Sequence, residues 1–405
     1  MSTLRKFVQL NAIMCSLIST GAYASVPIPA EGTKSQAMGG VSVAIPLDTF
    51  VMAANPAGIA FLNDRFDVNL TYTRPYDDVK IQNNALISKR TFNSSPDFFV
   101  PLGGIKKDFS CLSMGVCTFG RGAAVNYGTF IPIYGTSKFR LTFLQLIVKP
   151  CVAWKINENH SIGVGVNLAM SQFKNEGAQR LKAISSAPTH LTNKGYDYRP
   201  GIGFHIGWIG KFFERLNIGI ALESQIFNHR FKKYRGLIPE YGKVNGPSIV
   251  TAGFSYDFPC GLTVAFDYQK LFWQPLRAFS NKLTFEELLG SSEGSGQGWR
   301  NEDRYKVGIA YQVNENLTLR AGYQYQRPVF SSSQLYNNVN AATNFPNKYI
   351  CGGISWASGC NEISIAYMQS LRDHMNGTLP LAVGGGDIRT KALNQIVGIS
   401  WGRQF

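Results

Sequence analysis

The chain has 405 residues, a formal net charge of +15 and an apolar content of 44%. Beyond residue 24 it holds no run of about 18 consecutive apolar residues, which argues against a membrane-spanning helix. In a cytosolic protein, such a basic charge would suggest that the protein binds nucleic acid. The N-terminus directs this chain to secretion, however, so we expect no nucleic-acid partner.

The N-terminus has the order of features found in a secretory signal peptide. Arg5 and Lys6 supply positive charge, Phe7 to Thr20 is mostly apolar, and Ala22-Tyr23-Ala24 forms an A-x-A cleavage site. We therefore predict that residues 1–24 are a Sec-type signal peptide that is removed from the mature protein.

Residues 25–65 are rich in alanine and glycine and lack strand periodicity. Asn55 precedes a proline and is biased towards extended backbone, while Gly58 permits a sharp reversal. Small residues suit a compact plug, or hatch, that packs inside a barrel; an unstructured periplasmic tail is the alternative. The expected hatch motif comprises Asp48, Asn55, Pro56, Ala57 and Gly58.

From residue 66 onward the chain repeats a strand, a short turn, a second strand and a long polar loop. Alternate positions from Leu317 to Tyr325 are apolar or aromatic, and Thr318, Arg320 and Gln324 lie between them. This period of two predicts strands with one apolar face. The predicted strands cover residues 66–75, 96–104, 111–122, 140–155, 161–173, 199–211, 215–228, 247–257, 261–272, 303–313, 316–327, 347–357, 361–371 and 391–405.

The connections, the strand lengths and the C-terminus favour a membrane barrel over a soluble sandwich. Short turns such as Asn314-Glu315 alternate with long loops, and the strand number is even. Trp401 and the final Phe405 share the apolar face of the last strand, which suits recognition by the barrel-assembly machinery. We predict an all-β fold, a 14-stranded antiparallel barrel over residues 66–405, monomeric in a bacterial outer membrane.

These features resemble the FadL family of outer-membrane transporters for long-chain fatty acids and hydrocarbons. The resemblance implies a barrel with an N-terminal hatch, capture of a hydrophobic ligand by the external loops, and release through a wall opening at an inward kink of the third strand. The residues that carry it are the Ala/Gly-rich start through Gly40, Asp48, Asn55-Pro56-Ala57, the stretch from Phe119 to Gly128, Ser161 to Asn167, Trp299 to Lys306, and Val313 to Gly322.

The resemblance also implies positions for the kink and for the ligand. Gly120-Arg121-Gly122 falls late in the third strand, and glycine in a strand often marks a bend. Pro150 lies in the fourth strand, where it either breaks the hydrogen-bond ladder or ends the strand early. The family's basic residues for a carboxylate would correspond approximately to Lys174, Arg180 and Arg300. Gly177 stands where the family can carry arginine, so a neutral hydrocarbon remains a second substrate class.

A basic cluster occupies the fourth external loop and interleaves with Phe231 and Tyr234. It either attracts anionic amphiphiles or binds lipopolysaccharide phosphates, and we prefer the second interpretation. Lipopolysaccharide and outer-membrane lipid are therefore expected partners. The basic residues are His229, Arg230, Lys232, Lys233 and Arg235.

Six of the seven cysteines follow the signal peptide, in an oxidising compartment. Cys117 and Cys151 are both expected to face inward from neighbouring strands, and a disulfide between them is compatible with hairpin geometry. Cys111, Cys260 and Cys360 fall at periplasmic turns. No Cys/His spacing suits a metal, so we expect neither a metal nor a cofactor.

An enzyme is not expected. Gly201-x-Gly-x-x-x-Gly207 resembles a phosphate loop only superficially, because it lies within an alternating strand. His205 is the histidine predicted to face the lumen, and it has no recognisable catalytic partner in the sequence. We predict a passive transporter for hydrophobic compounds such as long-chain fatty acids. A general or selective porin and a loop-mediated adhesin or structural barrel are the alternatives.

Overall fold

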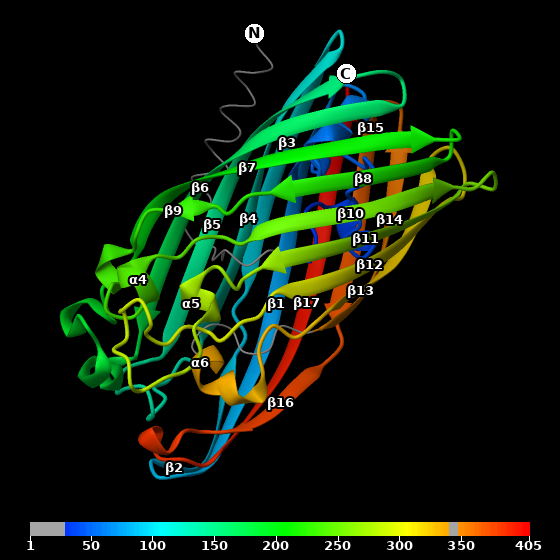
Figure 1. Cartoon of the computed structure of the whole chain (residues 1–405). Helices are drawn as coiled ribbons and strands as arrows, with labels where there is room; N and C mark the ends of the chain where they lie inside the picture. The colour runs from blue at the N-terminus through cyan, green and yellow to red at the C-terminus, as the bar shows by residue number, and fades with distance from the viewer. Residues whose placement is uncertain (1–28, 340–346) are drawn as a thin grey trace.

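The structure is a computed structural model that describes residues 29–339 and 347–405. The predicted signal peptide lies outside the described residues. Seventeen strands form one antiparallel sheet that closes on itself into a tilted barrel (Figure 1). None of the helices in the two described ranges is long and apolar enough to cross a membrane.

Fourteen of the strands form the closed ring, which confirms the predicted fold. The last strand pairs with the first from Arg65–Gln404 to Gln82–Asp387, so the ring has no free edge. The ring strands are β1 (Arg65–Asn84), β3 (Phe98–Phe109), β4 (Leu112–Asn126), β5 (Arg140–Lys155), β6 (His160–Glu176), β7 (Asp197–Phe212), β8 (Leu216–Glu223), β10 (Ser248–Asp257), β11 (Leu262–Phe272), β12 (Glu302–Gln312), β13 (Leu317–Gln326), β14 (Lys348–Ser358), β15 (Asn361–Ser370) and β17 (Asp387–Gln404).

Three short strands lie outside the ring: β2 (Ile87–Ser94), β9 (Phe227–Asn228) and β16 (Asp373–Thr378). β2 and β16 extend the outer ends of β1 and β17 beyond the rest of the barrel (Figure 1). The predicted strand 215–228 is wrong in its length. β8 ends at Glu223, because the register with β7 shifts by one residue between Glu223 and Phe227.

The side chains alternate between a lipid-suited exterior and a buried interior. On β15, the outward residues Ile363, Ile365 and Tyr367 are about half exposed, whereas the intervening Ser364, Ala366 and Met368 are buried. Water would oppose so large an exposed apolar band, but the hydrocarbon of a bilayer favours it. The alternation read from the sequence therefore reflects lipid outside and packed protein inside.

Turns are short at one end of the barrel and long at the other. Cys111, Cys260 and Cys360 lie at short turns and are exposed. The long loops carry short helices, at the left of Figure 1. These are η3 (Gln179–Ile184), η4 (Pro188–His190), η5 (Lys232–Tyr234), α4 (Pro239–Gly242), α5 (Arg277–Ser280), η6 (Ser332–Gln334), α6 (Leu335–Val339) and η7 (Leu381–Val383).

Residues 29–64, which we call the inner segment, precede β1 and are almost entirely buried. They contain α2 (Thr33–Ala37), α3 (Val51–Ala54) and η2 (Pro56–Phe61). α2 packs against β13, β14, β15 and β17, and η2 packs against β4, β5, β6 and β7. The inner segment thus touches most of the wall from within, as the dark-blue ribbon in Figure 1 shows.

Candidate functional site

The Asn-Pro-Ala motif fastens the inner segment to the wall. The Asn55 Nδ2 group donates to the carbonyl oxygens of Val43 (2.8 Å) and Trp208 (3.0 Å), and its Oδ1 accepts from the Ala57 amide (3.1 Å). Pro56 occupies the first turn of η2, where a missing N–H costs nothing. A Cβ on Gly207 would lie 2.0 Å from Asn55 Oδ1, so only glycine lets the motif reach β7.

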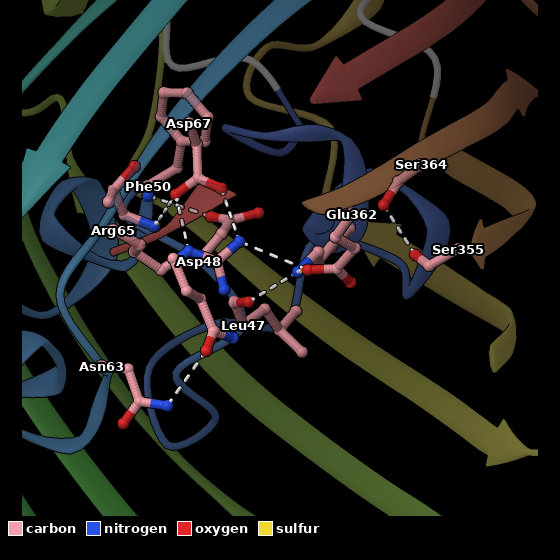
Figure 2. Close-up of polar contacts among 12 residues, drawn as sticks. Leu47, Asp48, Phe50, Asn63, Arg65, Asp67, Ser355, Glu362 and Ser364 are labelled. Atoms are coloured by element: carbon pink, nitrogen blue, oxygen red, sulfur yellow. Dashed lines mark hydrogen bonds and ion pairs between the residues drawn. The ribbon is translucent and has the colours of Figure 1, made fainter. Parts of the chain in front are cut away.

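Asp48 belongs to a second attachment, shown in Figure 2. Its Oδ1 accepts from the Phe50 amide (2.9 Å), while the Thr49 amide donates to Asp67 on β1 (2.9 Å). Arg65 bridges Asp67 (2.6 Å) and Glu362 on β15 (3.3 Å). Burial, reinforced by the nearby charge of Asp67, raises the pKa of Asp48 to about 6.

Lys34 completes this attachment from α2. It forms an ion pair with Glu362, and its Nζ donates to the Leu47 carbonyl oxygen (3.0 Å). The loop that carries Asp48 is therefore held by charged groups on both the inner segment and the wall.

The hydrogen-bond ladder between β3 and β4 is incomplete. The two strands pair only from Gly103–Thr118 to Phe109–Leu112. Above that point residues 98–102 pair with β1 alone, and residues 119–126 pair with β5 alone. Three consecutive residues in the unpaired part of β4, Phe119, Gly120 and Arg121, are buried. Both faces of the strand are therefore covered here, as an inward bend of the Gly120-Arg121-Gly122 stretch requires.

A buried charged cluster lies behind this part of β4. Arg121 Nη1 donates to Glu223 Oε1 on β8 (2.8 Å), and Lys149 on β5 donates to Glu223 Oε2 (3.2 Å). The Lys149 Nζ also lies 2.7 Å from His205 Nδ1 and donates to the Ala53 carbonyl oxygen (3.2 Å). The cluster therefore joins four neighbouring parts of the wall, β4, β5, β7 and β8, to the inner segment.

Sequence reasoning placed His205 in the lumen but missed Lys149 and Glu223. The available signal was that both residues occupy inward-facing positions of strands whose side chains alternate between the two faces. A charged residue on an inward position of a buried strand needs a partner, and each of these residues has one on another strand.

Pro150 does not end its strand, because β5 continues to Lys155. The ladder with β6 is interrupted instead. Pairing holds at Val148–Leu168 and resumes at Cys151–Gly165, and the two positions between them are unpaired. The interpretation of Pro150 as a strand end is thus wrong, and the broken-ladder interpretation agrees with the register. The lipid-facing surface is hollowed at this point, between Met114 and Phe204.

A large apolar cavity, which we call the outer cavity, lies among the long loops. It encloses about 990 Å³ of space between side chains, part of it open to solvent. None of the described residues that line it carries a charge. Tyr134 and Tyr336 stack at 4.9 Å between ring centroids, and Phe143 meets Phe173 edge-on at 5.9 Å. The aromatic lining comprises Tyr134, Phe143, Phe173, Phe279, Trp299 and Tyr336, with Phe285 beside them.

A smaller polar cavity, which we call the inner cavity, lies deeper in the barrel beside the inner segment. Arg121 and Lys306 contribute positive charge to its lining, and Glu31, Glu223 and Asp267 contribute negative charge. The described lining therefore has no excess of positive charge. Arg121 lines the inner cavity and Ala123, two residues further along β4, lines the outer one. The two cavities thus both border the part of β4 that is unpaired with β3.

The three cations expected at a ligand carboxylate are not brought together. Lys174 points outward from β6, pairs with Glu176 (2.9 Å) and lies over the Tyr196 ring. Arg180 and Arg300 are exposed in loops. None of the three lines the outer or the inner cavity. The structure therefore gives no support to them as a carboxylate-binding set.

The expected pairing of Cys117 with Cys151 needs correction. Both thiols are buried on the inner side, as predicted, but both are free. The register places Cys117 opposite Lys149 and Cys151 opposite Gly115, so the two cysteines are diagonal and not opposite one another.

The fourth-loop cluster divides into two kinds of residue. Phe231 and Tyr234 are buried and pack against Phe143 and Phe173, beside the outer cavity. The basic residues between and around them, His229 included, are all exposed. The loop thus anchors itself with its aromatic side chains and presents its cations on the surface.

A closed barrel with an apolar exterior and an occupied lumen defines the class of outer-membrane transport barrels. The family model described as outer membrane protein transport protein (OMPP1/FadL/TodX) matches residues 12–335. The chain belongs to this family. It is therefore a transport channel of the outer membrane and not an enzyme.

Solved structures share this fold at low sequence identity. The Pseudomonas putida toluene transporter TodX aligns with a TM-score of 0.71 and 15% identity over 94% of this chain and 99% of its own. A Pseudomonas aeruginosa FadL homologue gives 0.68 and 16% over 95% and 100%. The Ralstonia pickettii toluene transporter TbuX gives 0.63 and 18% over 93% and 99%. Among curated protein sequences, none matches this chain.

Proposed function

We propose that this protein is a passive uptake channel for neutral hydrophobic compounds, with the outer cavity as its capture site. The observation that carries the proposal is the uncharged, aromatic lining of that cavity. A concave site lined mostly by apolar and aromatic side chains suits a small hydrophobic ligand. The toluene transporters with the same fold are in keeping with such a substrate.

Long-chain fatty acids are the second candidate substrate. A carboxylate needs a cation, and among the described lining of the inner cavity the lysine or arginine without a direct ion pair is Lys306, whose Nζ donates to the Gly40 carbonyl oxygen (3.2 Å). Asp267 also lines this cavity and accepts from the Ser42 and Val43 amides. The negative charge of Asp267 would repel the carboxylate of a fatty acid, so a neutral ligand is favoured.

We further propose that the ligand leaves sideways, through the wall between β3 and β4. Support comes from the missing ladder beside residues 119–126 and from the two cavities, which border the same part of β4 at Ala123 and Arg121. A molecule that passes there would enter the bilayer without crossing the lumen. The inner segment acts as the hatch in this proposal, and it blocks the direct aqueous path.

Ligand binding tests the substrate class. The purified full-length protein in detergent is titrated with naphthalene and with oleate, and binding is measured by equilibrium dialysis. We expect naphthalene to bind, and Leu237→Glu, which places a charge in the lining, to weaken that binding by at least about tenfold. Leu381→Glu, at a loop residue that is 92% exposed, is the matched control and should leave it unchanged.

Lys306→Met separates the two substrate classes. Naphthalene binding should stay within about twofold of wild type if the ligand is neutral. Oleate binding that exceeds naphthalene binding and disappears in Lys306→Met would establish the fatty-acid function instead.

A reversible cross-link tests the exit. Extension of the β3–β4 register places Pro101 opposite Gly120, so Pro101→Cys with Gly120→Cys would join the unpaired parts. Cys117→Ala and Cys151→Ala remove the nearest native thiols. Oxidation should stop uptake while binding in the outer cavity persists, and a reductant should restore uptake.

A second pair of cysteines serves as the control for the cross-link. Ile105 and Val116 are already opposite one another in the intact ladder, so Ile105→Cys with Val116→Cys should not affect uptake when oxidised. Uptake that continues in the oxidised Pro101→Cys, Gly120→Cys variant, once mass spectrometry has verified the disulfide between the two introduced cysteines, would rule out this exit.

A further inference from the structure

Two external loops are fastened together beside the end of β7. The Lys233 amide donates to Asp197 Oδ2 (2.9 Å) and its Nζ donates to the Tyr196 carbonyl oxygen (2.6 Å). The Tyr234 hydroxyl donates to the Gly195 carbonyl oxygen (2.6 Å). These contacts hold the β8–β10 loop against the β6–β7 loop, so cations far apart in the sequence come to lie on one surface.

We define the loop patch as the exposed cations Lys194, Arg230, Lys232, Lys233 and Arg235. Within the described parts of the chain, none of the five forms an ion pair with a carboxylate. The pKa of the neighbouring His190 is lowered, first by partial burial and then by the positive charges of Arg235 and Lys194. Lys194 was not part of the cluster predicted from sequence, because it arrives from a different loop.

The loop patch lies directly above the lipid-facing surface. β7 begins at Asp197, and its first outward residue, Tyr198, is 55% exposed and lies near the Tyr196 ring, 6.0 Å between centroids. Exposed Ile202 and Phe204 follow on the same face. Aromatic residues at the end of an apolar band mark the membrane interface in outer-membrane barrels. The patch is therefore at the level where the head groups of the outer leaflet carry their phosphates.

The loop patch is also held rigid. Phe231 and Tyr234, which alternate with its cations, pack edge-on against Phe143 and Phe173 of the barrel. Side chains presented from an anchored loop lose less freedom when they bind an anion than those of a mobile tail. Arginine and lysine in such an array suit phosphate oxygens, with which they form charge-assisted hydrogen bonds.

We propose that the loop patch is a binding site for a phosphorylated glycolipid of the outer leaflet, whose saccharide phosphates contact Arg230, Lys232 and Arg235. The glycolipid is retained beside the barrel and is not transported. This inference goes beyond the proposed function, since the patch contributes no side chain to the described lining of the outer cavity.

Binding of bisphosphorylated lipid A to the full-length protein in detergent tests the proposal by native mass spectrometry. We expect Arg230→Glu with Arg235→Glu to lower the retained glycolipid at least about tenfold, and Arg230→Gln with Arg235→Gln to lower it less. Dephosphorylated lipid A should bind wild type as weakly as the charge-reversal variant binds the phosphorylated form. Naphthalene binding in the same variants should match wild type, so failure here is distinguishable from failure of the transport proposal.

The control variant is Lys80→Glu with Arg389→Glu. These cations lie opposite one another on β1 and β17, away from the patch, and their reversal should leave lipid A binding unchanged. The proposal is overturned if that variant loses binding to the same extent, or if both forms of lipid A bind equally. Competition by inorganic phosphate as effective as that by lipid A would show a simple anion site and would also overturn it.

Discussion

Asp48 is a buried carboxyl group whose pKa, about 6, lies above the ordinary value of 3.8. Between these two values the folded protein holds a proton that the unfolded chain has released. The free energy of unfolding therefore falls as the pH rises from about 4 to about 6 and is constant above that range, as far as Asp48 is concerned. A shift of two pKa units corresponds to roughly 3 kcal/mol.

Asp48→Asn should remove this dependence while its side-chain oxygen keeps the hydrogen bond from Phe50. Relative to wild type, the variant should gain stability between about pH 4 and about pH 7, by up to roughly 3 kcal/mol. Urea unfolding of the detergent-folded protein, followed by tryptophan fluorescence, measures the difference. Glu158→Gln changes a turn carboxylate that is 92% exposed and should leave the pH dependence as in wild type. An Asp48→Asn curve parallel to wild type would contradict the assignment.

At the level of single residues, the sequence predicted the local backbone correctly where a short pattern of neighbouring residues determines it. Asn55 is an example, since the residue before a proline is expected to be extended and Asn55 has extended backbone, with φ −153° and ψ 107°. The sequence could not orient Lys174, Arg180 and Arg300, because proximity to a strand end does not say which way a side chain points. Their role at a ligand carboxylate stays a prediction.

The unpaired part of β4 is joined to β8 by Glu223, and Arg121 also lies 3.5 Å from Glu31 of the inner segment. Glu223 accepts from both Arg121 and Lys149, and all three side chains are almost fully buried. Loss of a partner from a buried ion pair leaves an uncompensated charge, which costs about 3–5 kcal/mol. Glu223→Gln should therefore destabilise the barrel strongly and loosen β4 from β8.

Urea unfolding measures this loss, and hydrogen exchange of residues 119–126 reports the loosening. The matched control is Glu176→Gln, which removes the partner of the partly exposed Lys174 and should cost no more than about 1 kcal/mol. Equal stability of the two variants would show that the buried cluster does not fix β4.

The strands themselves could be predicted because lipid acts on every one of them in the same way. Each strand exposes one face to hydrocarbon, so a period of two appears in its sequence whatever its neighbours are. β8 was predicted too long because the bulge after Glu223 leaves the apolar alternation nearly intact. The inward positions of Lys149, His205 and Glu223 could be read from the sequence, but their mutual contacts could not, since three separate strands supply them.

At the scale of the whole molecule, we propose that the inner segment closes the lumen. Residues 29–64 touch strands around the ring and are attached at several places, among them Asn55 to β7, Lys34–Glu362 to β15 and Thr49–Asp67 to β1. The ring itself closes through β1 and β17 without help from this segment. A barrel without the inner segment should therefore still fold, but with an open lumen.

Deletion of residues 29–60 from the mature chain should convert a closed barrel into a conducting pore. In planar bilayers we expect stable ion currents from the deletion variant and little current from the full-length protein, because water and ions fill a lumen that no longer holds packed protein. A heat-modifiable shift on gels confirms that the variant has folded, so absence of current cannot be ascribed to an unfolded chain. Equal currents from both proteins would mean that the full-length barrel is already open, and a porin would then account for the fold better than a hatch-gated channel for neutral hydrophobic compounds.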